Sequence, residues 1–244
     1  MKAIIFDAFG TLFQVTAGGS ARTIMKNIAA CGEIVDEKQF LEEWKTYYKN
    51  HTSDSCEFMT ERDIFISRIQ MFYDRYQVKR SAKEDADSLL AGAFEREAYP
   101  EVKSVLDELM EKYQVFIGSN TDNDVLESVM QKNRIQVHKV YTSENLKCYK
   151  PSAQFYRQIL DDNGLKPCDV LFVGDSITDD VLGPKAIGIK PVWLDRSGMG
   201  ASFGQDYTIM DLNGLVKESK EISGILLRNK FGKCGGIIDG TLGS

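Results

Sequence analysis

Polar residues follow four short apolar runs of the sequence, at positions where several of them could act together. In chain order they are Asp7, then Ser119 with Asn120, then Lys150, and then Asp175 with Asp179 and Asp180. Each group alone is more typical of a turn, a helix cap or a solvated surface charge than of a catalyst. Their recurrence in order, each just after an apolar run, favours one shared site.

The charges of these residues indicate the chemistry of such a site. If the runs are parallel strands, their carboxyl ends lie at one edge of a sheet, so Asp7, Asp175 and Asp180 converge with only Lys150 opposing them. Carboxylates a few ångströms apart cannot all stay ionised without a counter-charge. Oxygen ligands of this kind suit Mg²⁺, which usually shares its site with a phosphate. We therefore expect phosphoryl transfer with an aspartate as the nucleophile.

The composition leaves carboxylate and lysine chemistry open and disfavours other chemistries. The chain has 244 residues, with 30 Lys and Arg against 36 Asp and Glu, and this net charge of −6 argues against a nucleic-acid partner. Only two histidines are present, which disfavours serine–histidine triads and multi-histidine metal sites. The expected partner is therefore a small-molecule substrate.

The expected location is the cytoplasm. The five cysteines form no Cys-x-x-Cys pair, and an odd, scattered set predicts free thiols in a reducing compartment. No apolar run reaches the roughly 18 residues that cross a bilayer, so no membrane partner is expected. Asp7 interrupts the first apolar run too early for a secretory signal.

Strands that alternate with helices predict an α/β core. Strands are expected at 3–6, 115–118, 139–142, 170–173 and 191–194, and helices at 100–113, 124–133, 152–163 and 179–187. This alternation predicts a parallel sheet with helices on both faces. Sites in such sheets lie beyond the carboxyl ends of the strands.

Consecutive helices interrupt this alternation early in the chain. They are expected at 21–30, 35–50, 60–76 and 81–98, and the last two begin with capping boxes, Thr60-x-x-Asp63 and Ser81-x-x-Glu84. We therefore expect an all-helical insertion at 15–98 within a core formed by 1–14 and 99–228. A glycine-rich, flexible tail is expected at 229–244.

The four polar groups together resemble the four motifs of the haloacid dehalogenase (HAD) superfamily. The matching segments are 4–12, 117–120, 150–151 and 173–180. The resemblance covers nearly all of residues 1–218 and implies a Rossmann-like core. It also implies a helical cap of the first type (C1) between motifs one and two, where the helical insertion lies.

The resemblance assigns roles to individual residues. It implies that Asp7 is the nucleophile, that Ser119 hydrogen-bonds a phosphoryl oxygen of the substrate, and that Lys150 neutralises the nucleophile and the developing charge. Thr11 in motif one joins this catalytic set. The implied metal is Mg²⁺, and its ligands are Asp7, Asp175 and the backbone carbonyl of Phe9. Asn120 and Asp180 are the supporting residues behind this set.

Phe9 departs from the phosphatase pattern of this superfamily. The usual phosphatase carries there a second aspartate, which protonates the leaving group and then deprotonates the attacking water, and phenylalanine can do neither. Losing a positioned general acid–base costs about 10²–10⁴ in rate. We therefore expect a phosphohydrolase limited to good leaving groups, such as aryl or acyl phosphates.

Phe9 also keeps two other functions open. Haloacid dehalogenases resemble this chain in an aromatic residue near that position and in Tyr156, a possible substrate contact; a halide also leaves without protonation. They lack the metal aspartate of motif four, which is Asp175 here, and they use a cap arginine that the stretch 32–45 does not contain. A catalytically inactive HAD-fold binding protein is the third possibility, although such a protein has no physical need of four convergent polar groups.

Overall fold

The computed structural model describes residues 1–15, 19–53 and 57–217, and its centre is a parallel β-sheet. The strands are β1 (Ala3–Phe6), β2 (Gln114–Ser119), β3 (Lys139–Thr142), β4 (Val170–Gly174), β5 (Lys190–Leu194) and β6 (Tyr207–Ile209). Their order is β3-β2-β1-β4-β5-β6, and every neighbouring pair is parallel. Phe6 pairs with both Ile117 and Val173, so the three central strands end almost level.

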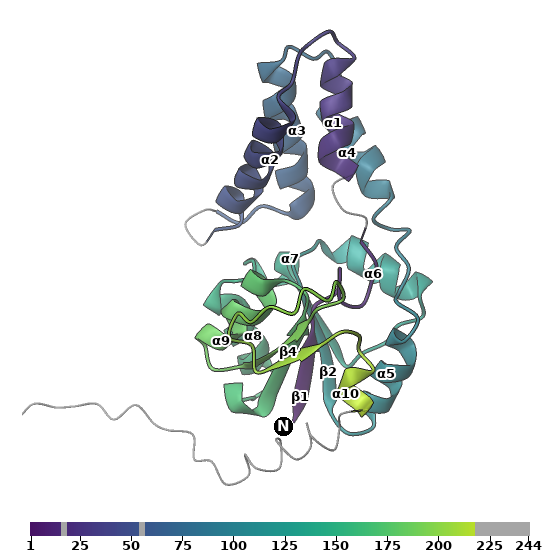
Figure 1. Ribbon diagram of the computed structural model, residues 1–244, viewed down its shortest axis with the longest axis vertical. Coiled ribbons are helices and arrows are strands. Elements are labelled where there is room, and N and C mark those ends of the chain that lie inside the picture. The colour runs from purple at the N-terminus through teal and green to yellow at the C-terminus, as the bar shows by residue number, and fades with distance from the viewer. Residues whose placement is uncertain (16–18, 54–56, 218–244) are drawn as a thin grey trace, which may run out of the picture.

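Helices cover both faces of this sheet, because alternate strand residues point to opposite sides. Ile4 and Phe6 belong to one apolar cluster with α5 (Val102–Met110), α6 (Asn123–Lys132) and α10 (Gly214–Lys217). Ala3 and Ile5 pack on the other face against α8 (Ala153–Asp162). Figure 1 shows α5 and α6 on one side of the sheet, and α8 with α9 (Gly183–Ala186) on the other. The expected Rossmann-like α/β architecture is confirmed.

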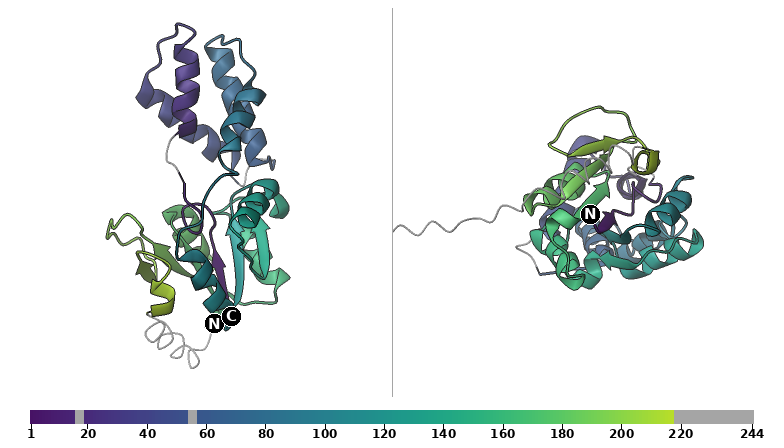
Figure 2. Two further views of the ribbon diagram at one scale, coloured as in Figure 1. Left: turned by 90° about the vertical axis from the view of Figure 1, so that its right-hand side faces the viewer. Right: turned by 90° about the horizontal axis from the view of Figure 1, so that it is seen from below.

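Four further helices form a separate bundle that stands over the carboxyl edge of the sheet (Figures 1 and 2). They are α1 (Gly19–Ala29), α2 (Glu37–His51), α3 (Glu61–Arg75) and α4 (Ala82–Ala91). An aromatic cluster holds the bundle together, with Phe40 stacked on Trp44 and 4.3 Å from Phe72 between ring centroids. We call this bundle the cap.

The two segments that connect the cap to the sheet lie side by side. Gln14 N–H donates to the Glu97 carbonyl at 2.9 Å, and Tyr99 N–H donates to the Leu12 carbonyl at 3.0 Å. Both segments therefore leave the sheet at one point, between β1 and α5.

Several elements differ from the sequence expectations. The helix expected over 81–98 ends at Ala91, before Gly92, a poor helix former, and residues 92–98 return to the sheet without helical structure. The helix expected at 179–187 is instead a π-helical turn, Ile177–Leu182, followed by α9. Pro184 has no N–H to continue the α-helical pattern, which is consistent with the widened turn.

Four short elements were not expected from the sequence, namely β6, α7 (Ser143–Leu146), α10 and a 3-10 helix at Pro167–Asp169. The glycine-rich tail at 229–244 lies outside the described residues. Within the described residues, no helix combines the length and the apolar character needed to cross a membrane.

Candidate active site

Asp7 is the first residue after β1 and lies at the carboxyl edge of the sheet, under the cap. Its backbone N–H donates to the Val173 carbonyl at 2.9 Å, which fixes the start of the loop. Its side chain is buried and its Oδ1 receives two contacts, from Ser119 Oγ at 3.1 Å and from Lys150 Nζ at 2.8 Å. Since both contacts use Oδ1, they orient the carboxylate and leave Oδ2 as the oxygen available for attack.

Lys150 links two carboxylates in the interior of the site. Its ammonium group is 2.8 Å from Asp7 Oδ1 and 2.8 Å from Asp180 Oδ1, and all three side chains are buried. Burial alone would lower the pKa of Lys150, but the charges and hydrogen bonds of Asp180 and Asp7 outweigh it and raise the pKa. The ammonium group therefore stays charged. Asn120 positions this residue by hydrogen bonds to its backbone N–H and carbonyl, at 2.8 and 3.0 Å.

Asp175 approaches the motif-one loop from the end of β4. Thr11 Oγ1 donates to Asp175 Oδ1 at 3.3 Å. Gly10 makes room for this approach, since a Cβ atom there would lie 2.5 Å from Asp175 Oδ2, and its φ of +95° also favours glycine. Although the residue is still reached by solvent, loss of surrounding water and the nearby charge of Asp7 raise the pKa of Asp175 to about 6.

Asp7, Asp175 and Asp180 form an acidic trio. One carboxylate oxygen of each lies within 4.8 Å of the others. Opposite oxygen ligands of Mg²⁺ lie about 4.2 Å apart, because each bond is about 2.1 Å long. The trio with Lys150 carries a formal charge of −3 + 1 = −2, which a divalent cation balances. Hard oxygen donors, spacing and charge therefore all fit Mg²⁺, with Asp7 and Asp175 as the ligands nearest solvent and Asp180 engaged by Lys150.

A π-helical turn holds Asp180 in place. Ser176 N–H donates to Asp180 Oδ2 at 2.9 Å, while Asp180 Oδ1 accepts from Lys150. Burial raises the pKa of Asp180 and Lys150 opposes this shift. Tyr156 is fully buried in α8, and its hydroxyl donates to the Asp179 carbonyl. The structure thus places Tyr156 behind the turn, where it supports the motif-four loop, and not in contact with a substrate.

Phe9 faces an arginine that sequence analysis did not single out. Its ring is half-buried and lies 4.3 Å from the guanidinium of Arg96, on the segment that returns from the cap, and 6.0 Å from the Phe13 ring. Burial lowers the pKa of Arg96, and the charge of Glu61 opposes this shift. The position that carries an acid in related phosphatases is therefore occupied by an aromatic ring next to a cation.

Two more residues missed from the sequence brace the loops around the site. Arg196 Nη2 donates to the Thr11 carbonyl at 2.8 Å and forms an ion pair with Glu101. Trp193 Nε1 donates to the Asp175 carbonyl at 3.1 Å. Trp193 stands near the end of β5, and this position could have predicted that it lies at the same edge of the sheet. Arg196 follows in a loop, and no sequence motif predicted its role.

Asp122 connects the sheet to the cap. Its buried carboxylate accepts the backbone N–H groups of Glu61 at 2.8 Å and of Arg62 at 2.9 Å, at the N-terminus of α3. Burial raises the pKa of Asp122, and these two hydrogen bonds act against that shift. A carboxylate suits the positive end of the helix dipole. Since Asp122 follows Ser119 by three residues, one loop both contacts the nucleophile and holds the cap.

Substituting Asp122 by alanine is therefore expected to destabilise the protein by about 1.5–3 kcal/mol, since two hydrogen bonds to a buried charge are lost. Urea unfolding measures this change. Asp124→Ala is the matched control, because Asp124 is exposed and makes one ion pair with Arg62, worth less than about 1 kcal/mol. Equal destabilisation by the two substitutions would mean that Asp122 does not anchor the cap.

A cleft of about 920 Å³ opens between the end of α2 and the rim of the sheet. Its lining includes Lys45, Tyr48 and Lys49 from the cap, and Lys150 and Asp179 from the sheet side. The cleft therefore borders Lys150, the buried lysine that holds Asp7. We call it the cap cleft.

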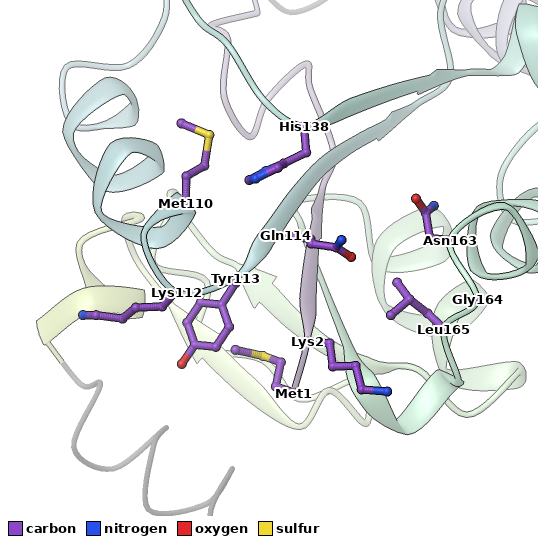
Figure 3. Close-up of a pocket in the computed structure, with 10 residues that line it drawn as sticks. All are labelled: Met1, Lys2, Met110, Lys112, Tyr113, Gln114, His138, Asn163, Gly164 and Leu165. Carbon is purple, nitrogen blue, oxygen red and sulfur yellow. The ribbon is translucent and has the colours of Figure 1, made fainter.

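A second hollow, of about 640 Å³, lies at the opposite edge of the sheet (Figure 3). Figure 3 shows Lys2 and Lys112 pointing in opposite directions across it. Lys2 pairs with Asp169, and His138 Nδ1 accepts the Val115 N–H. Its polar groups serve local structure and do not converge on a common point.

Comparison with known proteins agrees with this geometry. The family model for haloacid dehalogenase-like hydrolases matches residues 1–188. The chain belongs to this family. It is 24% identical to (S)-2-haloacid dehalogenase 4A of Burkholderia cepacia over 234 residues, which cover 94% of this chain and 96% of that protein. The HAD family therefore identifies the protein as a hydrolase.

Solved structures show the same fold at low identity. A dehalogenase crystal structure superposes with a TM-score of 0.67 at 21% identity, covering 89% of this chain and 96% of that one. The magnesium-bound HAD-hydrolase YfnB of Bacillus subtilis gives a TM-score of 0.68 at 14% identity, covering 93% of this chain and 98% of that one. These similarities establish the fold and leave the substrate to be argued from the site.

Proposed function

We propose that this HAD hydrolase is a magnesium-dependent phosphohydrolase that acts on small phosphate esters or acyl phosphates through an aspartyl-phosphate at Asp7. The observation that carries the proposal is the acidic trio, in which Asp175 lies beside the nucleophile with a single lysine opposing three carboxylates. An uncompensated pair of carboxylates is costly. A site that binds a divalent cation and a phosphate has a physical use for this arrangement, whereas a protein without catalytic activity does not.

The residues of the site have separable roles in such a reaction. Asp7 attacks phosphorus in line, the bond to the leaving oxygen breaks, and the leaving group departs with the electron pair. Lys150 keeps Asp7 ionised and oriented through its 2.8 Å contact, and Ser119 can turn its hydroxyl from Asp7 to a phosphoryl oxygen. Water then attacks the phosphorus of the aspartyl-phosphate and loses one proton to solvent, and the bond between phosphorus and the Asp7 oxygen breaks to release hydrogen phosphate and the free carboxylate. Mg²⁺, held by Asp7, Asp175 and the Phe9 carbonyl, would neutralise charge on the phosphoryl oxygens.

The absence of an acid at position 9 restricts this chemistry. The phenyl side chain of Phe9 has no acidic proton to give to a leaving oxygen. It lies against Arg96 and Phe13. Substrates whose leaving group is stable as an anion, such as aryl and acyl phosphates, do not need that proton. The rate is therefore expected to fall steeply as the pKa of the leaving group rises.

Removing the proposed metal ligand Asp175 tests the proposal. Asp175→Asn is expected to raise the Mg²⁺ concentration needed for half-maximal hydrolysis of 4-nitrophenyl phosphate at least 10–100-fold, since even residues that only orient a metal ligand contribute about that much. Calorimetric Mg²⁺ titration without substrate gives an independent readout. Asp206→Asn, which removes an exposed charge away from the rim, is the control. An unchanged Mg²⁺ requirement in Asp175→Asn would contradict the proposed site.

Hydrolysis of 2-haloacids is the second candidate function. The similarity to (S)-2-haloacid dehalogenase 4A over most of both chains favours it, as does Phe9, because a halide leaves without a proton. In that reaction Asp7 would displace the halide from carbon, and water would cleave the resulting ester. The presence of Asp175 next to Asp7 weighs against it, because this chemistry needs no cation to balance the second carboxylate.

A further inference from the structure

The cap cleft carries positive charges that the chemistry at Asp7 does not use. Lys45 and Lys49 both line it, and they stand one helical turn apart on α2, so their side chains extend from the same face. Lys150 lies in the same cleft, but Asp7 and Asp180 already balance its charge. Within the part of the chain that the structure describes, no carboxylate balances either cap lysine in this way.

Most other cap cations near acidic residues are paired. Arg62 contacts Asp87 and Asp124, Arg75 contacts Glu43, and Arg80 contacts Asp85. Among the described residues, Lys45 and Lys49 form no ion pair within 4.0 Å. Like charges one turn apart destabilise a helix, and an anion placed between them removes that repulsion. In a chain of net charge −6, two such lysines at the mouth of the site mark a place for an anion.

The size of the cleft indicates how large the ligand is. A volume of about 920 Å³ lies near the upper end of the roughly 300–1,000 Å³ found for small-molecule sites. A phosphoryl group is much smaller than this volume. Lys150, which contacts Asp7, borders the cleft, so a substrate with its phosphoryl group at Asp7 has room to extend toward α2. Thr52, Ser152 and Thr178 add hydroxyl groups to the lining, while Asp179 repels anions on the sheet side. An anionic group is therefore best placed on the cap side.

We propose that Lys45 and Lys49 bind a second anionic group, a carboxylate or phosphate, on the leaving group of the substrate. This inference rests on the proposed function, since it places the reacting phosphoryl group at Asp7 and the second anion at the cap. The preferred substrate is then a phosphate monoester or acyl phosphate with a negative charge at its far end. The two lysines are specificity residues and take no part in bond breaking.

Two ligands that differ by one carboxylate test the inference. They are phenyl phosphate and 4-(carboxymethyl)phenyl phosphate, whose phenol leaving groups have nearly the same basicity. Their dissociation constants are measured by calorimetry with the Asp7→Asn chain in Mg²⁺, so that neither ligand is consumed. We expect the carboxylated ligand to bind about tenfold more tightly, or about threefold for each lysine, as for exposed ion pairs. The preference should shrink as ionic strength rises.

Substitution of the lysines completes the test. Adding Lys45→Gln and Lys49→Gln should abolish the tenfold preference, so that the two ligands bind with nearly equal affinity. Lys38→Gln is the matched control, since Lys38 is exposed on the same helix and does not line the cleft. Equal binding of both ligands to the starting chain, or a preference that survives the double substitution, would overturn the inference.

Turnover of phenyl phosphate by the unsubstituted chain tests the phosphohydrolase function separately. If no phosphate is released but the lysine-dependent preference is present, the proposed reaction is wrong and the anion site stands. If phosphate is released but the preference is absent, the reaction stands and the anion site is wrong. The two proposals therefore fail by different measurements.

Discussion

Asp7→Asn is expected to lower phosphate release from 4-nitrophenyl phosphate by at least about 10⁴-fold, the scale seen when a catalytic nucleophile is removed. An amide retains the shape of the carboxylate but is a very poor nucleophile toward phosphorus. Ser119 and Lys150 still hold the side chain at this position, so the loss reflects the missing carboxylate, both as nucleophile and as proposed Mg²⁺ ligand, and not a displaced side chain. Steady-state release of 4-nitrophenol measures the effect.

Asp169→Asn is the matched control for this experiment. Asp169 also lies next to a central strand, but at the opposite edge of the sheet, where it pairs with Lys2 at 3.0 Å. We expect it to retain nearly full activity. If Asp7→Asn kept more than about a hundredth of the activity, covalent catalysis by Asp7 would be untenable.

Phe9→Asp is expected to raise turnover of alkyl phosphates by about 10²–10⁴-fold, because it supplies the missing general acid–base. Aryl phosphates should gain little, since their leaving groups need no proton. The ratio of turnover with an alkyl phosphate to turnover with 4-nitrophenyl phosphate is therefore the informative measurement, and it also corrects for any change in the amount of folded protein.

Arg96 is expected to reduce the gain in alkyl phosphate turnover that Phe9→Asp produces. Its guanidinium lies 4.3 Å from the Phe9 ring, and a cation that close to a new aspartate lowers the pKa of the carboxyl group and weakens it as an acid. The gain in alkyl phosphate turnover from Phe9→Asp alone should therefore lie near the lower end of the expected range. The double variant with Arg96→Gln should show a larger gain. Arg96→Gln alone should not improve alkyl phosphate turnover. If neither Phe9→Asp variant gains, the proton is supplied elsewhere or is not needed.

The parts of this fold that follow from local sequence were predictable. Short apolar runs with polar ends predicted the positions of the five longest strands. Thr60 and Ser81 accept the N–H groups of Asp63 and Glu84, which is the N-cap half of each predicted capping box. Asp7, Ser119 and Asp175 likewise stand at the ends of strands, and Lys150 follows β3 after the short helix α7. A parallel sheet brings such ends to one edge, so the order of Asp7, Ser119, Lys150 and Asp175 was enough to predict that they meet.

The contacts between cap and sheet could not be predicted in this way. Asp122 meets Glu61 and Arg62 across 60 or more positions of the sequence, and Arg96 meets Phe9 because the helix ends at Ala91 and residues 92–98 turn back toward the sheet. The spacing of apolar residues predicts helices and strands, but it does not predict the angle at which the cap packs against the sheet. Tyr156 shows the opposite error, since a match to a family pattern suggested a substrate contact for a side chain that is fully buried.

The most direct test of the account is to measure phosphate release from an aryl phosphate and chloride release from a 2-chloro acid with one protein preparation, with and without a chelator. The acidic trio predicts phosphate release that Mg²⁺ stimulates and the chelator abolishes, with no chloride released. Chloride release that is indifferent to the chelator, without phosphate release, would contradict the account and establish the dehalogenase function in its place.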